Sequence, residues 1–481
     1  EHLAIAHASL QGAVQTALAA VAGIAAARPC APGLKIRRPE GQPNTQPEHV
    51  PRASTGKPQG SAGSKHVRHT SPHRQGRVRQ LIQASARRPL VVVGAGAAGM
   101  ATALAAARGG AEVLLVERAG AVGGTVADAL IHTIGGLFDE GGAPVNGGVA
   151  LELAERLQAA DARTVQRRIG RTRVLNADPA VYRRVVQHWL AESSRITCLT
   201  EAAVTGIECA DGRVVRLRLR VGPVDEHDIQ PGAVVDASGD AVVVRRIDPG
   251  LVEPGAALAG LVAVLRGAAP GALDFPKGVA LIKRLRAAAG AGELPGECAT
   301  LWLDSGIAAD EVYLKLNLSA DRFDAAHMRA VLARLVPWLR SLPELSRVEA
   351  GALGALGVRD GGRVRGRYRL TEADLKAGRC FDDTVCVGCW PIEHWHPEQG
   401  IRLEYLPPGT RYDIPLRALQ VAGIDGLYAA GKCLSAEPRA QASARVAGTC
   451  WGMGAGLGER LAAALATAAD APKPACPGAE T

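Results

Sequence analysis

The chain has 481 residues, of which 47% are hydrophobic and 3% aromatic; this composition excludes a mainly disordered or fibrous protein. Its net charge of +9 is unevenly distributed, because residues 1–88 hold 13 of the 56 Lys and Arg but only three of the 47 Asp and Glu. The other 43 basic and 44 acidic residues nearly cancel. We therefore expect no nucleic-acid partner for residues 89–481.

Residues 28–88 are rich in Pro, Gly, Ser, Gln, His and Arg and contain almost no branched apolar side chains. Such a segment buries too little apolar surface to offset its ordering entropy. We therefore expect residues 1–88 to form a disordered basic tail, with an arm for an acidic partner as the alternative. A flexible tail is also expected over residues 471–481.

The ten cysteines are scattered, and only Cys386 and Cys389 form a close pair. This usage is typical of a reducing compartment, so a cytoplasmic location is expected. The longest uncharged stretches, residues 3–27 and 89–107, do not resemble membrane spans, so no membrane partner is expected. A redox role for the cysteine pair would require a helix N-terminus to lower the thiol pKa, and its apolar, β-like surroundings do not favour one.

The ordered part is predicted to begin at residue 89. The expected elements are a strand at 90–93, an Ala-rich helix to 108, a strand at 112–117, helices at 147–168 and 178–194, strands within 196–220 and a strand at 234–237. Residues 251–420 mix strands and helices and resemble an inserted second domain. Residues 427–470 return to a strand, a turn and a long Ala- and Gly-rich helix.

The sequence Gly94-Ala95-Gly96-Ala97-Ala98-Gly99 directly follows a strand and opens a helix. In this position the first Gly permits a tight turn, the second lets a pyrophosphate approach the backbone, and the third lets helix and strand pack closely. The helix N-terminus supplies N–H donors for phosphate. Glu117 ends the next strand and is placed to accept hydrogen bonds from ribose hydroxyls, which favours FAD or NAD over NADP.

Further glycine-rich turns distinguish the two cofactors. Gly123-Gly124-Thr125 follows closely after Glu117, and residues 234–240 end a buried strand in a turn of small residues. Residues 426–432 run from a strand into glycine, and residues 444–450 open the last helix. A cofactor that contacts both ends of the chain is an extended one, which favours FAD.

On these motifs the chain resembles the FAD-dependent oxidoreductases of the glutathione-reductase-type Rossmann class, over about residues 89–468. The turn at Ser238 and the turn at Lys432 resemble family turns that carry Thr and Arg at these places. The resemblance implies that the glycine loop holds the pyrophosphate and that the last helix begins at the flavin. The implied cofactor-binding residues are Gly94, Gly96, Ala97, Ala98, Gly99, Glu117, Arg118, Gly123, Gly124, Thr125, Ser238, Gly239, Gly431, Gly448 and Thr449.

Catalytic candidates lie in the middle of the chain. Arg363, Arg365 and Arg367 alternate, so a strand would place them on one face, where they could bind a carboxylate or remain a solvated face. His394 and His396 are also two residues apart, and either is a candidate acid or base, with a structural role beside the neighbouring tryptophans as the alternative. Because these histidines lack nearby ligands in register, no metal site is expected.

We therefore predict an α/β flavoprotein with a Rossmann-type FAD-binding domain from residues 89–250 and 415–470 and a mixed α/β substrate domain at 251–414. The predicted function is hydride transfer between a small organic substrate and the flavin, with His394, His396 and Arg363 as catalytic candidates. The alternatives are a flavoprotein acting in RNA modification or partner binding and an NAD-dependent Rossmann dehydrogenase. The sequence leaves the substrate, the electron acceptor and the oligomeric state open.

Overall fold

A computed structural model describes residues 88–255, 258–319, 325–396 and 400–470. All of these residues belong to one compact unit of the chain. The predicted tails lie outside the described residues, apart from Arg88. Two hydrophobic cores organise the described part: a large one around a parallel sheet and a smaller one around an antiparallel sheet.

The parallel sheet has five strands in the order β22-β10-β1-β2-β6. Their short, almost continuous apolar sequences are typical of strands that are covered on both faces. The three central strands are buried along their whole length. The bounds are β1 Leu90–Val93, β2 Val113–Val116, β6 Ile196–Leu199, β10 Ala233–Asp236 and β22 Leu427–Ala429.

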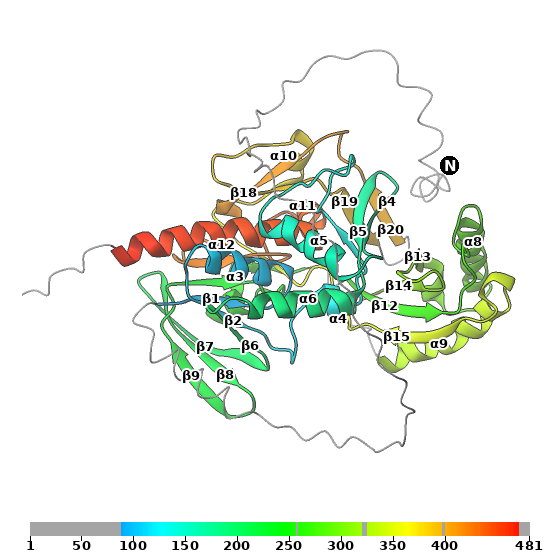
Figure 1. Cartoon of the computed structure of the whole chain (residues 1–481), viewed down its shortest axis with the longest axis horizontal. Coiled ribbons are helices and arrows are strands. Elements are labelled where there is room, and N and C mark those ends of the chain that lie inside the picture. Colours follow the sequence, from blue (N-terminus) through cyan, green and yellow to red (C-terminus); the bar gives the residue numbers. More distant parts are fainter. Residues whose placement is uncertain (1–87, 256–257, 320–324, 397–399, 471–481) are drawn as a thin grey trace, which may run out of the picture. The chain divides into compact units, whose positions relative to one another are not determined.

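Helices α3 (Ala97–Arg108) and α12 (Ala447–Asp470) pack side by side against the sheet (Figure 1). The approach is close because small residues line both helices. A Cβ built on Gly454 would lie 2.1 Å from the carbonyl oxygen of Ala98, and one on Gly458 would lie 2.5 Å from that of Thr102. The glycines of the last helix are therefore required by packing.

The segment between β2 and the insertion supplies further helices and two three-stranded sheets, β3-β5-β4 and β7-β8-β9. The predicted helix over 147–168 is too long: α5 ends at Ala160, and the chain then enters β4, which pairs with β5. The bounds are α4 Gly124–Asp128, β3 Thr133–Gly135, α5 Val149–Ala160, β4 Val165–Ile169, β5 Thr172–Asn176, α6 Pro179–Ala191, β7 Ala202–Ala210, β8 Arg213–Val221, β9 Asp225–Ile229 and α7 Val242–Ile247.

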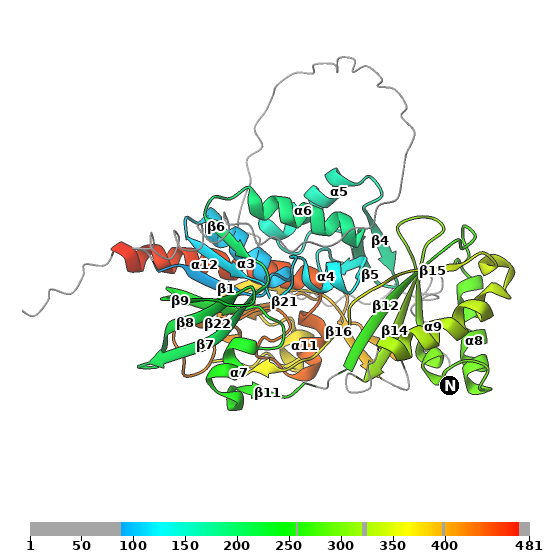
Figure 2. The same cartoon turned by 90° about the horizontal axis from the view of Figure 1, so that it is seen from below.

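The smaller core lies in an antiparallel sheet of order β13-β14-β12-β15, with β16 paired to β12. One face packs on α8 and α9 (Figure 2) through alternate residues of β12 and β14 such as Leu261 and Leu314. The alternation leaves Tyr313 and Lys315 on the opposite face. The bounds are β12 Leu258–Arg266, α8 Lys277–Gly290, β13 Trp302–Ser305, β14 Val312–Ser319, α9 Ala325–Arg340, β15 Glu349–Leu353 and β16 Gly357–Val358.

Short two-stranded pairings complete the described part: β11-β17, β18-β21 and β19-β20. β18 falls within the predicted substrate domain yet packs on α12, where a Cβ on Gly456 would lie 2.0 Å from the carbonyl oxygen of Val385. The bounds are β11 Val252–Glu253, β17 Arg363–Val364, α10 Glu372–Ala377, β18 Thr384–Gly388, β19 Ile392–His396, β20 Gly400–Glu404, β21 Tyr412–Pro415 and α11 Pro438–Ala444, with 3-10 turns η2 Pro249–Leu251, η3 Gly296–Thr300, η5 Pro343–Leu345 and η6 Leu416–Ala418.

Candidate active site

Four strands of the parallel sheet end at one edge, and each is followed by a glycine turn or a carboxylate. Gly94 follows β1, Glu117 follows β2, the turn with Ser238 follows β10, and Gly431 follows β22. Since parallel strands share a direction, their carboxyl ends meet, and in open α/β sheets this edge is where ligands bind. The fold thus assembles predicted residues that lie hundreds of positions apart.

The glycine loop is compact and leaves no space for side chains at two of its glycines. Gly94 has a φ of +105°, and a Cβ there would lie 2.5 Å from the carbonyl oxygen of Ala237. A Cβ on Gly99 would lie 1.8 Å from the carbonyl oxygen of Gly94. At Gly96, in contrast, a Cβ would meet nothing within 4 Å. The backbone therefore presents an open edge at Gly96, where α3 begins.

The first turn of α3 has no side-chain cap, because Gly96 occupies the N-cap position. The N–H groups of this turn, including those of Ala97 and Ala98, have no partner inside the helix, which suits an anionic ligand. The paired glycines close the other side of the loop: the N–H of Gly123 donates to the carbonyl oxygen of Ala95 at 3.0 Å. A Cβ on Gly124 would lie 2.7 Å from the Cα of Gly96.

Glu117 is fixed against the glycine loop. Its carboxylate accepts hydrogen bonds from the N–H of Ala95 at 2.7 Å and from that of Ala119 at 2.8 Å. The side chain is half-buried, so the carboxylate reaches solvent beside the loop. Arg118 and Thr125 are exposed.

The turns after β10 and β22 contact each other and α3. Asp236 accepts hydrogen bonds from the Ser238 hydroxyl at 2.6 Å and from the N–H of Val243 at 2.8 Å, which holds the turn against α7. A Cβ on Gly239 would lie 2.5 Å from the side chain of Lys432. A Cβ on Gly431 would lie 3.3 Å from the Cβ of Ala98, so this turn borders the start of α3.

The N-terminus of α12 lies against the loop that follows β3. A Cβ on Gly448 would lie 2.6 Å from the carbonyl oxygen of Gly135, and one on Gly136 would lie 2.5 Å from the Thr449 hydroxyl. The Thr449 hydroxyl is buried without a hydrogen-bond partner. Because buried polar groups are normally satisfied, this hydroxyl indicates a place for a polar group of a ligand.

A buried imidazole lies between the loop after α4 and the antiparallel sheet. The Nε2 atom of His132 lies 3.1 Å from the carbonyl oxygen of Ser305 and 3.4 Å from a carboxylate oxygen of Asp304. Both neighbours are acceptors, so the proton of the neutral ring belongs on Nε2. Nδ1 is left buried and unpaired. The ring packs on Tyr313 with centroids 3.7 Å apart, and burial lowers the pKa of His132 to about 4.

Asp304 is the anion around which this group assembles. Arg167 donates to it at 2.9 Å, and the ammonium of Lys315 lies 3.7 Å from it and 3.3 Å from the Thr133 hydroxyl. Burial alone would raise the pKa of Asp304, but His132 and the two cations lower it well below its usual range. Burial lowers the pKa of Lys315.

A second ionic group adjoins the first through Lys315. Glu393 accepts hydrogen bonds from the indole N–H of Trp390 at 3.0 Å and of Trp395 at 2.6 Å, and Arg445 lies 3.8 Å from it. The guanidinium of Arg359 lies 4.1 Å from the centroid of a Trp395 ring, and its Nη1 atom is buried without a hydrogen-bond partner. Burial lowers the pKa of Arg359 to about 9.

The chain matches the family described as FAD dependent oxidoreductase over residues 89–248 and 267–473. The chain belongs to this family. FAD is therefore its cofactor, and the nicotinamide alternative does not apply. No curated protein matches the sequence. The glutathione-reductase-type subdivision stays a prediction.

Three solved structures illustrate what the chain is similar to. A geranylgeranyl bacteriochlorophyll reductase-like protein from Thermoplasma acidophilum is 11% identical, with 80% of this chain and 79% of that one covered and a TM-score of 0.44. The anhydrotetracycline hydroxylase from Streptomyces rimosus is 15% identical (79% and 63% covered, TM-score 0.43). The p-nitrophenol 4-monooxygenase from Pseudomonas putida is 13% identical (80% and 80% covered, TM-score 0.39).

The geometry fits the cofactor of the FAD-dependent oxidoreductase family. The uncapped N-terminus of α3, the open edge at Gly96 and the unpaired Thr449 hydroxyl are sites that a dinucleotide with polar groups along its length would satisfy. The assignment of individual residues to parts of FAD stays a prediction.

The predicted catalytic residues lie on two short strands, β17 and β19. Arg363 is buried and forms ion pairs with Asp360 and Glu253. The strand expected over 363–367 is wrong: β17 covers only Arg363–Val364, and Arg365 and Arg367 are exposed. His394 is exposed on the β19-β20 hairpin, and the side chain of His396 lies outside the described residues. Their catalytic roles stay predictions.

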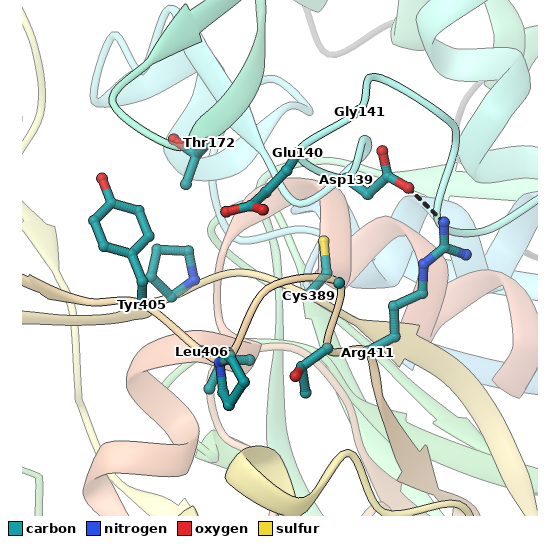
Figure 3. A pocket seen from close by; sticks show the side chains of 12 residues that line it. Asp139, Glu140, Gly141, Thr172, Cys389, Tyr405, Leu406 and Arg411 are labelled. Carbon is teal, nitrogen blue, oxygen red and sulfur yellow. Dashed lines mark hydrogen bonds and ion pairs between the residues drawn. The ribbon is translucent and has the colours of Figure 1, made fainter. Parts of the chain in front are cut away.

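A cleft of about 240 Å³ lies beside the second cysteine of the close pair (Figure 3). Its rim carries an ion pair of 2.6 Å between Arg411 and Asp139, drawn as a dashed line. Cys386 and Cys389 are both free thiols, and burial raises the pKa of Cys389 to about 12. A thiol with so high a pKa is a poor nucleophile at neutral pH.

Sequence reasoning missed most of the buried ionic group. His132 follows the paired glycines in the chain, but its partner Ser305 is 173 residues away. Among the described residues, no cluster of His, Cys, Asp and Glu is arranged to hold a metal ion. Within the same residues, no helix is both long and apolar enough to span a bilayer.

Proposed function

We propose that this FAD-dependent oxidoreductase transfers hydride between a small organic substrate and FAD. The proposal rests on one observation: the ends of four strands and the start of α12 lie along a single path for the cofactor. This path runs from the open edge at Gly96 to the unpaired hydroxyl of Thr449. Trp390, which bonds Glu393 of the second ionic group, packs on Gly135 beside the start of α12, so a substrate has polar partners near this end of the path.

The residues of the path have separate tasks. The N-terminus of α3 and the loop at Gly96 bind the phosphates, and Glu117 orients a ribose. The N-terminus of α12 at Thr449 favours negative charge on the ring system through its unpaired N–H groups. When bound, FAD supplies the two-electron redox chemistry. The chain's own task is to position the substrate, exclude water and move a proton.

His132 supports the proposal as the group that handles the proton. Its Nε2–H is held by Ser305 and Asp304, which leaves Nδ1 as an unpaired base inside the protein. With a pKa of about 4 the ring is neutral at physiological pH, so Nδ1 is available as a hydrogen-bond acceptor. This assignment differs from that of His394, which is exposed.

The visible spectrum of the purified chain tests the proposal. We expect flavin absorbance that bleaches with dithionite, and anaerobic bleaching by at least one member of a panel of alcohols, amines and hydroxy acids. His132→Asn should slow bleaching by substrate on the order of 100-fold or more, while leaving bleaching by dithionite unchanged. A flavin-loaded protein that dithionite reduces but no organic donor reduces, and that in its reduced form reduces no organic acceptor, would contradict hydride transfer.

A further inference from the structure

The two ionic groups form one electrostatic network with unequal charge. Lys315 interacts with Asp304, Glu393, Arg167 and Arg359, and Arg359 interacts in turn with Glu393 and Arg445. Counted together, the network holds four cations, two carboxylates and the neutral imidazole of His132. With Lys315 protonated, these named groups carry an excess of two positive charges in a largely buried place. An excess of buried charge is costly unless a counter-ion neutralises it.

Hydrogen-bond donors in the network are also left over. The Nη1 atom of Arg359 and the Nε atom of Arg167 are buried without a hydrogen-bond partner. Glycine at position 260 makes room for the Arg359 guanidinium, because a Cβ there would lie 2.4 Å from its Nη2 atom.

Three members of the network reach solvent. The side chains of Lys315, Glu393 and Arg445 keep between 13% and 16% of their surface exposed. These charges are thus shielded from bulk water but reachable from it, which is the condition under which a charge-assisted hydrogen bond discriminates strongly between ligands.

The network also borders the end of the predicted FAD path. The side-chain amide of Gln441 donates to the carbonyl oxygen of Arg359 at 3.1 Å and to that of Lys432 at 3.0 Å, next to Gly431. Trp390, which bonds Glu393, packs where a Cβ on Gly135 would lie, 2.5 Å from its ring. The backbone of Arg359 and the carboxylate of Glu393 are therefore linked to the segments at Gly431 and Gly135.

We propose that Arg359 and Lys315 bind the anionic group, a carboxylate or a phosphate, of the substrate that this oxidoreductase acts on. The planar fork of Arg359 matches the paired oxygens of either group, and Lys315 adds a point charge. The inference rests on the proposed function, because it names the substrate class of that same site. An uncharged substrate would leave the two cations without a counter-ion.

Isothermal titration of the FAD-loaded full chain tests the inference without any turnover. The probes are acetate, its uncharged isostere acetamide, and inorganic phosphate. We expect acetate or phosphate to bind and acetamide not to bind, and the probe that binds identifies the group. Arg359→Gln should raise the dissociation constant at least tenfold, whereas Arg402→Gln, at an exposed arginine of β20, should change it less than twofold.

Absence of binding by both anions, or equal binding to the Arg359→Gln and wild-type chains, would overturn the inference. Since Arg359 packs on Trp395, Arg359→Lys serves as a second variant that keeps the charge, and it should restore part of the affinity. The proposed function fails separately: a chain that binds acetate but exchanges hydride with no organic compound refutes hydride transfer alone. A chain reduced by a neutral alcohol without anion binding refutes the inference alone.

Discussion

At the scale of single residues, the neutral imidazole of His132 makes the stability of the fold depend on pH. Its pKa is about 4 in the folded chain and 6.5 in the unfolded chain, so between these values the unfolded state binds the extra proton. The contribution to stability is full above pH 6.5 and is lost as the pH falls toward 4. From pH 7.5 to 5 we expect a loss of about 2 kcal/mol.

Urea unfolding at the two pH values measures this loss in the wild-type chain and in His132→Asn. The variant lacks the titrating group, so its free energy of unfolding should fall by about 2 kcal/mol less over the same interval. The difference between pH values is decisive, because any constant cost of the substitution cancels. Equal pH dependence in both chains would show that His132 is not held neutral by burial.

Substitution of two glycines of the loop should cause different defects, one in the stability of the fold and the other in FAD binding. A Cβ on Gly99 would strike the carbonyl oxygen of Gly94, whereas one on Gly96 would point into open space. Gly99→Ala should therefore destabilise the fold itself, by roughly 2 kcal/mol. Gly96→Ala, at the N-cap of α3, should destabilise the FAD-free chain by only about 0.5–1 kcal/mol yet weaken FAD binding at least about tenfold, or 1.4 kcal/mol. Flavin fluorescence titration measures the affinity for FAD. If Gly96→Ala left this affinity unchanged, the cofactor would have to bind away from this edge.

At the scale of elements, the contact between α12 and α3 depends on helical glycine. A Cβ on Gly458 would lie 2.5 Å from the Thr102 carbonyl oxygen, so Gly458→Ala should separate the helices and cost roughly 1–3 kcal/mol. The matched control is Gly290→Ala at the end of α8, where a Cβ meets nothing within 4 Å. That change should stabilise by about 0.5–1 kcal/mol through helix propensity. Thermal unfolding compares them, and shifts of the same sign would contradict the packing argument.

The same elements show what a sequence can specify. The strands at β1, β2, β10 and β22 were predictable because short apolar runs bounded by glycine are local signals. The break at Ala160 was not, since β4 is a strand only because β5 pairs with it, and such tertiary pairing leaves no local pattern. The ionic group was hidden for the same reason: Arg167 and Asp304, 137 positions apart, meet only in the folded chain.

At the scale of the whole molecule, the two hydrophobic cores are joined by polar contacts as well as apolar ones. Val262, Val264 and Tyr313 of the antiparallel sheet form a small apolar cluster with the loop at Leu130 and Ile131. Beside this cluster, Arg167 of β4 donates a hydrogen bond to Asp304 of β13. Asp304 is therefore one of the groups that hold the two cores together, along with the contacts of Lys315 with Thr133 and of His132 with Ser305.

Asp304→Asn should weaken this junction more than it weakens either core. Arg167 and Lys315 would keep their charges without the anion, and because both are partly exposed we expect a cost of about 2–4 kcal/mol, below that of a fully buried pair. Hydrogen exchange should quicken in β13 and β14 before it quickens in β1. The control is Asp228→Asn, which removes an exposed partner of Arg218 and should cost less than about 1 kcal/mol. If the two substitutions destabilised the chain equally, Asp304 would be an ordinary surface carboxylate, and the junction would be held by its apolar contacts alone.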